Sequence, residues 1–486
     1  MQVQSTAGAS APSGEQISMF TRIYSLTPGA AALRELEGLL QELERNLETL
    51  KLSLQEQQDA LTKVKTSGRN PQTATPIFTR QAISTLSQYA LDLHKSNEAS
   101  REALRCLANA FLLHEPSRQV FVDLGYAHKA ADRLTVDDHD DEFLIARILF
   151  YMTYNTTLDF QILLDQHSLA ENINRHISRH ANAYSKSAKR KSATAVSREA
   201  AMSETCKLMF NVTHYYPDSV PKFTPAIEPI INILRLHDLP DPPLQPPTSY
   251  LINALLNLDL QAAERRTPLG REARSSPMFP YSDTESFVNR LIDILDAAIR
   301  KQPERDLDQA AAPLCTLLRR LYELATSQMK AYMRWLLLPN TKDREKPLGQ
   351  GDTLSARLLR LSCSPNLPTL RGNISALLFE LSDKDANKFV QNIGYGFASG
   401  FLASQNIQVP ANAADASSSA DANDFNPITG QRLSAEDREE HGSEPMTEEE
   451  KEREAERLFV LFERLKATGV VDVKNPVERR FEEVDD

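Results

Sequence analysis

Hydrophobic positions near the start of the chain recur at steps of three and four residues. Within residues 30–65, leucine follows this rule at positions that share one helix face: Leu33, Leu36, Leu40, Leu43, Leu47, Leu50 and Leu54. Gly38 interrupts the run, which is also short for a coiled-coil arm, so the pattern favours packed helices of a larger body. Pro71 and Pro76 predict a break in the polar segment 67–76 that follows.

Four later apolar segments form a weak internal repeat. They cover residues 103–112, 145–155, 204–213 and 251–260, and each has an asparagine near its end: Asn109, Asn155, Asn211 and Asn257. The asparagines are 46, 56 and 46 residues apart, and the longer interval contains a basic insertion at 185–198. A helical period in the forties is typical of armadillo and HEAT arrays. We therefore predict an all-α solenoid over residues 1–407, continued by later helices at 313–325, 327–338 and 372–381.

Three polar segments separate these helices, at 185–198, 239–247 and 267–286. The first contains the basic triplet 189–191, which could be a nuclear-localisation patch, although a solvated loop is the favoured interpretation. The third contains Ser282 in an acidic context, which makes this serine a candidate phosphorylation site.

The character of the chain changes after residue 407. Residues 408–445 are poor in bulky apolar side chains, which predicts a disordered tether containing the turn-like element NPITG at 426–430. Residues 446–486 predict a helix and an acidic tail, with Thr447 and Glu450 as a capping box. The apolar face of this helix is expected to dock on the body or on a partner, through Leu458, Phe459, Leu461, Phe462 and Leu465.

The charge of the chain is concentrated at its C-terminal end. The 486 residues include 55 basic and 66 acidic side chains, a net charge of −11. Residues 431–486 hold 18 acidic and 10 basic side chains, or −8, which leaves −3 for the rest. This balance argues against binding to nucleic acid. No run of 18 apolar residues and no signal peptide is present, so we predict a cytoplasmic protein without a membrane span.

Signatures of covalent chemistry are absent, and no cofactor or metal is predicted. The cysteines are widely spaced without a CxxC pair, which predicts reduced thiols in the core at Cys106, Cys206, Cys315 and Cys363. Motifs of nucleotide-binding loops, zinc proteases and serine hydrolases do not occur. His176 and His180 are four residues apart and could hold a metal, so a metal-dependent hydrolase is one alternative. Because no third ligand is evident nearby, an exposed polar helix face is the favoured interpretation.

The repeat predicts a binding surface as well as a fold. In an α-solenoid the last helix of each unit lines the concave face, where residues four apart lie above one another. This rule aligns Arg105 with Asn109, Lys207 with Asn211, and Arg147 with both Tyr151 and Asn155. Asparagine amides can hold the backbone of a peptide, and the cations attract carboxylates. The alternative is that each asparagine bonds the neighbouring repeat.

The sequence resembles the synembryn family, the cytosolic exchange factors and folding chaperones of heterotrimeric G-protein α subunits (Gα). The resemblance spans about residues 100–480 and is carried most clearly by 372–407, by NPITG at 426–430 and by 446–465, in that order. Upstream, 106–125 and 206–220 are similar to repeat helices of the family. The resemblance implies an armadillo and HEAT fold that acts as a monomer and is recruited to the plasma membrane through Gα.

The resemblance also implies a mechanism without covalent chemistry. The concave groove grips the C-terminal helix of a GDP-bound, nucleotide-free or nascent Gα and promotes GDP release, while the tethered helix contacts the opened Gα. The implied groove residues are Arg105, Asn109, Arg147, Tyr151, Asn155, Lys207, Phe210, Asn211 and Asn257. The implied docking residues are Leu458, Phe459, Phe462 and Leu465. The family's phosphorylatable acidic stretch is reduced here, so Ser418 competes with Ser282 as the modified residue.

A peptide-binding armadillo adaptor without exchange activity is the alternative function. Nuclear-import receptors of that class repeat a tryptophan four residues before each groove asparagine. The single tryptophan of this chain is Trp335, which argues against such a receptor.

Overall fold

The computed structural model describes residues 28–93, 95–186, 194–265, 276–280, 283–407, 425–426 and 428–436. Within these ranges every regular element is a helix, and the one β-type contact is an isolated bridge between Phe425 and Arg432. The all-α class is therefore confirmed for the described part of the chain.

The helices follow one another along the chain in three groups. The first comprises α2 (Pro28–Thr49), α3 (Leu54–Ser67), η1 (Thr75–Phe78), α4 (Arg80–Ser87), η2 (Gln88–Asp92), α5 (Glu98–Leu113), α6 (Pro116–Asp123) and α7 (Tyr126–Arg133). The second comprises α8 (His139–Met152), α9 (Phe160–Gln166), α10 (Leu169–Lys186), α11 (Thr194–Tyr215), η3 (Pro217–Ala226), α12 (Ile227–Leu236), α13 (Thr248–Asn257) and α14 (Leu260–Arg265). The third comprises α15 (Ser286–Lys301), α16 (Glu304–Leu324), α17 (Ser327–Leu337), η4 (Asp343–Glu345), α18 (Leu354–Leu361), α19 (Pro368–Leu381), α20 (Ala386–Ile393) and α21 (Tyr395–Ser404).

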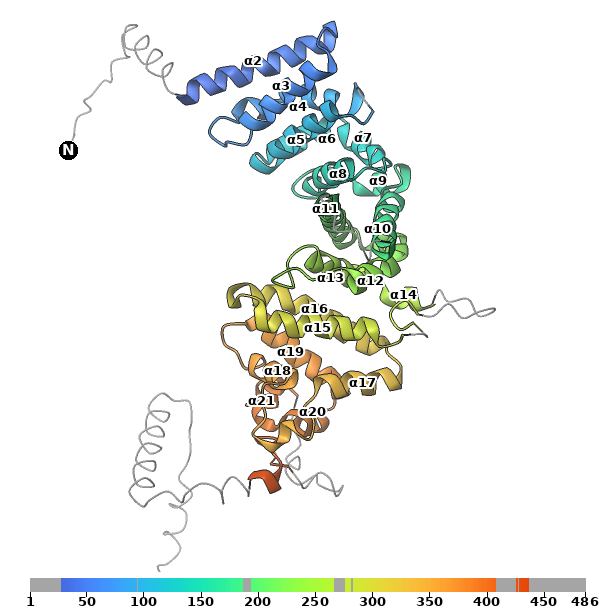
Figure 1. Ribbon diagram of the computed structural model, residues 1–486, viewed down its shortest axis with the longest axis vertical. Helices are drawn as coiled ribbons and strands as arrows, with labels where there is room; N and C mark the ends of the chain where they lie inside the picture. The colour runs from blue at the N-terminus through green and yellow to red at the C-terminus, as the bar shows by residue number, and fades with distance from the viewer. Residues whose placement is uncertain are drawn as a thin grey trace, which may run out of the picture.

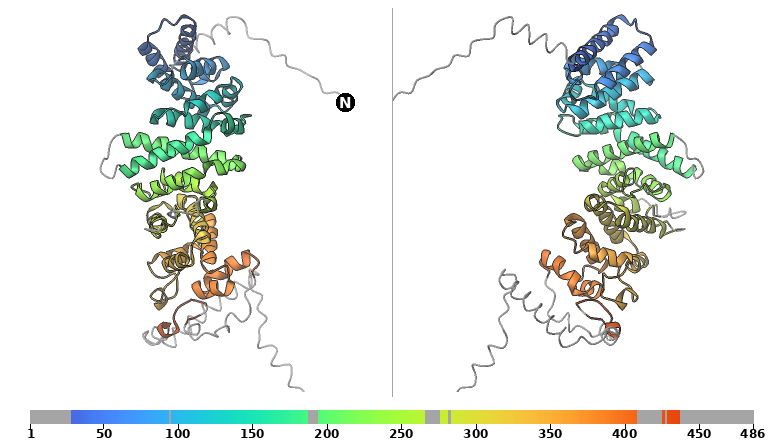
Figure 2. Two further views of the ribbon diagram at one scale, coloured as in Figure 1. Left: turned by 90° about the vertical axis from the view of Figure 1, so that its right-hand side faces the viewer. Right: turned by 60° about the vertical axis from the view of Figure 1, so that its left-hand side comes forward.

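These helices form one elongated, bowed stack that runs from α2 at one end to α20 and α21 at the other (Figure 1). The two views of Figure 2 show the same single column from other sides. Seven helices, which we call the inner layer, pack in succession, each on the next: α3, α5, α8, α11, α13, α16 and α19. Behind them α10, α12 and α15 pack on one another in the same way. This two-layered stacking is that of an α-solenoid.

Local sequence signals define the inner-layer helices. A capping box formed by Ser53 and Glu56 begins α3, and Asn97 with Ser100 forms another at the start of α5. Asp138 caps α8 by accepting hydrogen bonds from the amides of Asp140 and Asp141. Each helix then buries an apolar stripe, and the stripes join in one continuous core along the stack.

The four repeat segments lie where the pattern places them, on α5, α8, α11 and α13. These are consecutive members of the inner layer, which confirms that they are stacked neighbours. Asn155 lies beyond the end of α8, in a left-handed conformation with φ 56°. The segment 145–155 is therefore helical only as far as Met152.

Three sequence expectations need correction. Gly38 lies inside α2 and does not interrupt it; the helix ends at Thr49, and Leu50 turns the chain with φ 50°. Leu50 and Leu54 are exposed because the leucine face is divided between two helices. Cys106, Cys206 and Cys315 are buried as expected, but Cys363 is exposed after α18. All of these are free thiols.

Candidate peptide-binding surface

Two nearly buried carboxylates organise the charges of the inner layer. Glu102 on α5 lies between Lys65 on α3 and Arg105 on its own helix, with both nitrogen–oxygen distances at 2.6 Å. Arg105 is also 2.8 Å from Glu98. Each charge on this part of the surface thus has an opposite charge beside it.

The same arrangement recurs two inner-layer helices further on. Glu204 on α11 is 2.6 Å from Arg147 on α8 and 2.6 Å from Lys207 on α11. The Lys207 ammonium also lies 4.8 Å from the ring centre of Phe150 and 5.7 Å from that of Tyr250. The predicted basic residues therefore do line successive helices, but the carboxylates leave the surface nearly neutral.

Aromatic side chains gather where α8 and α11 end. We call the six rings of Phe150, Tyr151, Tyr154, Phe210, His214 and Tyr215 the aromatic cluster. Phe150 and Tyr154 are 5.3 Å apart between ring centres, and Tyr154 and Tyr215 are 6.4 Å apart, both edge to face. His214 is 5.0 Å from Tyr215 and stacks on Phe210 at 6.1 Å. Tyr154 and Tyr215 are respectively 36% and 51% exposed, so a large apolar area faces solvent beside the cations.

Tyr154, His214 and Tyr215 were not among the residues that the sequence suggested. The available signal was the spacing of four between Phe150 and Tyr154, and again between Phe210 and His214. Such pairs share one helix face while the helix continues. Phe210 and His214 both lie within α11, whereas Tyr154 lies two residues beyond the end of α8.

Three of the four repeat asparagines join neighbouring parts of the stack. The side-chain amide of Asn211 donates to Thr153 Oγ1 at 2.8 Å, and that of Asn257 donates to the carbonyl of Phe210 at 3.0 Å. The amide of Asn155 donates to Glu115 Oε1 at 2.8 Å. These contacts are of the kind expected if the asparagines bond adjacent repeats.

Asn109 differs from the other three. Its side-chain Nδ2 is buried and has no hydrogen-bond partner among the described residues. It lies on α5, one turn beyond Arg105. Asn109 therefore makes no contact between repeats of the kind that the other three asparagines make.

His176 and His180 do not form an exposed polar face, because both side chains are completely buried. His180 Nε2 is 2.9 Å from Glu142 Oε1, and His176 Nε2 contacts the carbonyl of Leu134 at 2.7 Å. Burial alone would raise the pKa of Glu142, but hydrogen bonds from His139, His176 and His180 outweigh it and hold this pKa well below its ordinary value.

The same cluster does bring a third potential metal ligand close to His180. Donor atoms of His139, Glu142 and His180 lie within 4.8 Å of one another. However, Arg179 Nη2 is 2.6 Å from Glu142 Oε2 and 3.3 Å from His139 Nδ1. Because this guanidinium supplies the positive charge between those ligands, the arrangement favours a structural ion pair over a metal centre.

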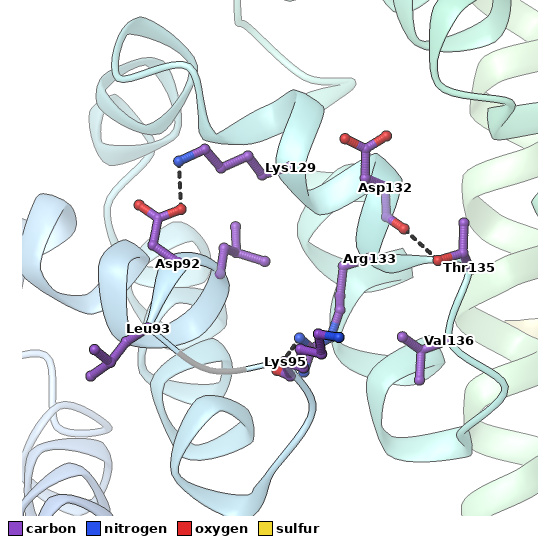
Figure 3. A pocket seen from close by; sticks show the side chains of 9 residues that line it. Asp92, Leu93, Lys95, Lys129, Asp132, Arg133, Thr135 and Val136 are labelled. Carbon is purple, nitrogen blue, oxygen red and sulfur yellow. Dashed lines mark hydrogen bonds and ion pairs between the residues drawn. The ribbon is translucent and has the colours of Figure 1, made fainter.

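A separate pocket of about 460 Å³ lies between η2 and α7 (Figure 3). Three of its charged groups are already engaged: Lys129 contacts Asp92, and Arg133 binds Asp141, at 3.1 Å for Nη2–Oδ1. None of the predicted groove residues lines it. The aromatic cluster and its flanking ion pairs are therefore the stronger candidate for a binding surface.

Several predicted residues lie outside the described part of the chain. They are the docking residues Leu458, Phe459, Phe462 and Leu465 and the candidate phosphorylation sites Ser282 and Ser418.

Comparison with known proteins identifies the family to which the chain belongs. A family model described as guanine nucleotide exchange factor synembryn matches residues 60–484. The chain belongs to the synembryn family. The match begins within α3 and extends beyond α21.

Individual relatives are distant from this synembryn-family chain. Chaperone Ric-8A of Macaca fascicularis is 24% identical over 450 residues, which cover 85% of this chain and 81% of the relative. Chaperone Ric-8A of Xenopus laevis is 24% identical over 466 residues with the same coverage. A synembryn-like chaperone of Schizosaccharomyces pombe is 31% identical over 170 residues, 32% of each chain. No helix in the described ranges of this family member is long and apolar enough to span a membrane.

Proposed function

We propose that this protein is a folding chaperone and guanine nucleotide exchange factor for Gα, and that its inner layer binds the C-terminal helix of Gα. Membership of the synembryn family supports the class of partner. The aromatic cluster is the single structural observation that carries the assignment of the surface. An amphipathic helix presents apolar side chains at positions three and four apart, which suits a row of partly exposed rings.

The polar groups beside the cluster would fix the orientation of the bound helix. Arg105, Arg147 and Lys207 are each half-buried and held at fixed positions by carboxylates. Asn109 offers a buried amide without a partner in the described structure. We assign Tyr151 and Phe210 to the apolar contact, and Asn155, Asn211 and Asn257 to the support of the surface from behind, through their contacts between repeats.

Exchange requires that the protein bind nucleotide-free Gα more tightly than GDP-bound Gα. By linkage, a factor with this preference lowers the affinity of Gα for GDP by the same ratio. Holding the C-terminal helix of Gα away from its core would create that preference. The same contact with a nascent Gα would protect a folding intermediate, which accounts for a chaperone activity on one surface. GTP binding would reverse the preference and release the factor.

The C-terminal segment 437–486 supplies a second contact in this proposal, and we call it the C-terminal arm. Its apolar residues Leu458, Phe459, Phe462 and Leu465 would pack against the opened Gα. Modification of Ser282 or Ser418 would adjust this activity. The protein would act as a monomer in the cytoplasm and reach the plasma membrane through Gα.

The decisive experiment measures GDP release from purified Gα with and without the full-length protein. We expect faster release and a stable complex with nucleotide-free Gα. No acceleration combined with no such complex would exclude the proposal. If a Gα C-terminal peptide binds but release is unchanged, the adaptor alternative is correct instead.

A peptide of the Gα C-terminal helix tests the surface itself. The double change Tyr154→Ala and Tyr215→Ala should weaken peptide binding about tenfold, as expected for removal of central aromatic contacts. The matched control is Ile162→Ala, which removes an apolar side chain of similar exposure, 37%, from α9 outside the inner layer. Equal peptide affinity of the two variants would show that the peptide binds elsewhere.

A further inference from the structure

Residues 425–426 and 428–436 are held against the lower end of the stack, although residues 408–424 separate them from the helices in the sequence (Figure 1, red). We call these residues the clasp. Asn426 shapes it: its Oδ1 accepts hydrogen bonds from the amides of Ile428 and Thr429 at 2.9 and 3.2 Å, and its carbonyl accepts one from Gly430 at 2.8 Å. The clasp is thus a closed turn with its own internal bonds.

Backbone groups fasten the clasp to the body. The amide of Gly396 donates to the carbonyl of Ile428 at 3.1 Å, and that of Leu348 donates to Thr429 at 3.1 Å. A Cβ at Gly394, where φ is 79°, would lie 2.8 Å from the Ile428 carbonyl oxygen. Glycine at 394 is therefore required twice, by the backbone angle and by the close approach of the clasp.

Arg344, a buried residue in η4, joins the clasp to the body. Its side chain donates to the carbonyls of Gly430 at 2.9 Å, Gln391 at 3.0 Å and Asn392 at 2.8 Å. The last two carbonyls belong to the end of α20, and the guanidinium also lies 4.6 Å from the ring centre of Phe425. With only 7% of the residue exposed, this cation is committed to holding two separate pieces of backbone together.

We propose that Arg344 is a positioning residue for the C-terminal arm: by closing the clasp it fixes the point from which residues 437–486 leave the stack. This inference rests on the proposed function, in which the arm contacts Gα. With the clasp closed, the tether predicted before residue 446 is the 9 residues 437–445; with the clasp open, it is the 38 residues 408–445. For a tether, effective concentration falls roughly as the −3/2 power of length, a loss of about 9-fold.

The test uses full-length protein and two variants that open the clasp from opposite sides. Arg344→Gln removes the three-way contact, and Gly430→Ala places a Cβ against Leu348 at a residue with φ 68°. Both should accelerate hydrogen exchange at the amides of Gly396 and Leu348. Both should also lower GDP release about 9-fold while leaving affinity for the Gα C-terminal peptide unchanged. Lys342→Ala, a nearby exposed residue, is the control and should change none of these.

A variant that already lacks a working C-terminal arm distinguishes a positioning role of Arg344 from a general loss of stability. In a protein whose arm is disabled by Leu458→Glu and Phe462→Glu, Arg344→Gln should have no further effect on GDP release. A further loss in that background would overturn the inference, because Arg344 would then act without the arm. Unchanged exchange at Gly396 and Leu348 in both clasp variants would also overturn it. Failure of the wild-type protein to act on Gα at all would instead reject the proposed function.

Discussion

Asn211 and Asn109 occupy similar places on two helices of the inner layer, but their amides differ in what they contact. Asn211 is 5% exposed and bonds Thr153 at the end of α8. Asn109 has a buried Nδ2 without a partner in the described part of the chain. The first amide joins α11 to the end of α8, whereas the second contributes no hydrogen bond within the described structure.

Alanine substitution of the two asparagines should therefore affect different properties, stability in one case and peptide binding in the other. Asn211→Ala leaves Thr153 without its donor and should lower the free energy of unfolding by about 1 kcal/mol. Asn109→Ala should leave stability almost unchanged and weaken binding of the Gα C-terminal peptide. Urea denaturation and a peptide titration on both variants provide the measurement. Equal losses of stability would contradict the division of roles.

At this scale the sequence predicts residue types better than residue roles. The four asparagines do lie on, or just beyond, successive inner-layer helices. Only the interatomic distances show which of their amides bond a neighbouring repeat and which has no partner in the described structure. Tyr154 lies in the predicted segment 145–155, but α8 ends at Met152, so the turn after the helix decides which way this ring faces. Tyr215 lies beyond the predicted segment 204–213, at the last residue of α11. Glu102 and Glu204 were missed because pairing across helices depends on the packing of segments about 40 or more residues apart.

Among the elements, α8, α10 and α11 meet around one buried carboxylate. Glu142 on α8 accepts from His180 and Arg179 on α10 and from Thr205 on α11, the last at 2.7 Å. Burial lowers the pKa of His180 below its ordinary value of 6.5, although Glu142 opposes this shift. The junction is therefore adapted to a neutral histidine.

This adaptation predicts a pH dependence of stability. Because the pKa of His180 is lower in the folded state, the unfolded chain takes up a proton first as the pH falls below about 6.5, and stability declines. His180→Gln keeps a donor for Glu142 but cannot titrate, so its stability should decline less between pH 7.5 and 5.5. Urea denaturation at three pH values tests this. Parallel declines in the two proteins would assign the effect to other groups.

The elements themselves were largely predictable because apolar periodicity is a local property. The segments on α5, α11 and α13 and the later helices α16, α17 and α19 follow their hydrophobic spacing closely. Boundaries were less predictable: α16 begins at Glu304, well before its apolar run, and contains Pro313. The burial of His176 and His180 could not be anticipated, since it needs Glu142 and Arg179 to compensate for lost hydration.

The whole molecule is a column in which each inner-layer helix packs mainly on its immediate neighbours. Stability in such a column is approximately a sum of unit and nearest-neighbour contributions. A destabilising substitution at one end of the column should therefore affect only the helices near it. A compact domain of the same length would instead lose stability throughout.

A cavity in α5 tests this locality. Leu107 is completely buried, and Leu107→Ala should cost about 3 kcal/mol. We expect faster hydrogen exchange in α3, α5 and α8 and unchanged exchange in α16 and α19. The matched variant is Leu377→Ala, equally buried in α19, which should give the reverse pattern. Uniform acceleration along the chain in both variants would show a single cooperative unit.

The ion pairs of Glu102 and Glu204 affect how fast a partner helix can associate with the surface. Long-range steering requires unbalanced charge, and it is this contribution that dissolved salt suppresses. Here four cations, Lys65, Arg105, Arg147 and Lys207, lie at close range to three carboxylates, Glu98, Glu102 and Glu204, which leaves a single excess positive charge. A helix approaching the aromatic cluster would be guided over short distances only, so its association rate should vary little with ionic strength. Selectivity would then arise after contact, in how long each complex survives.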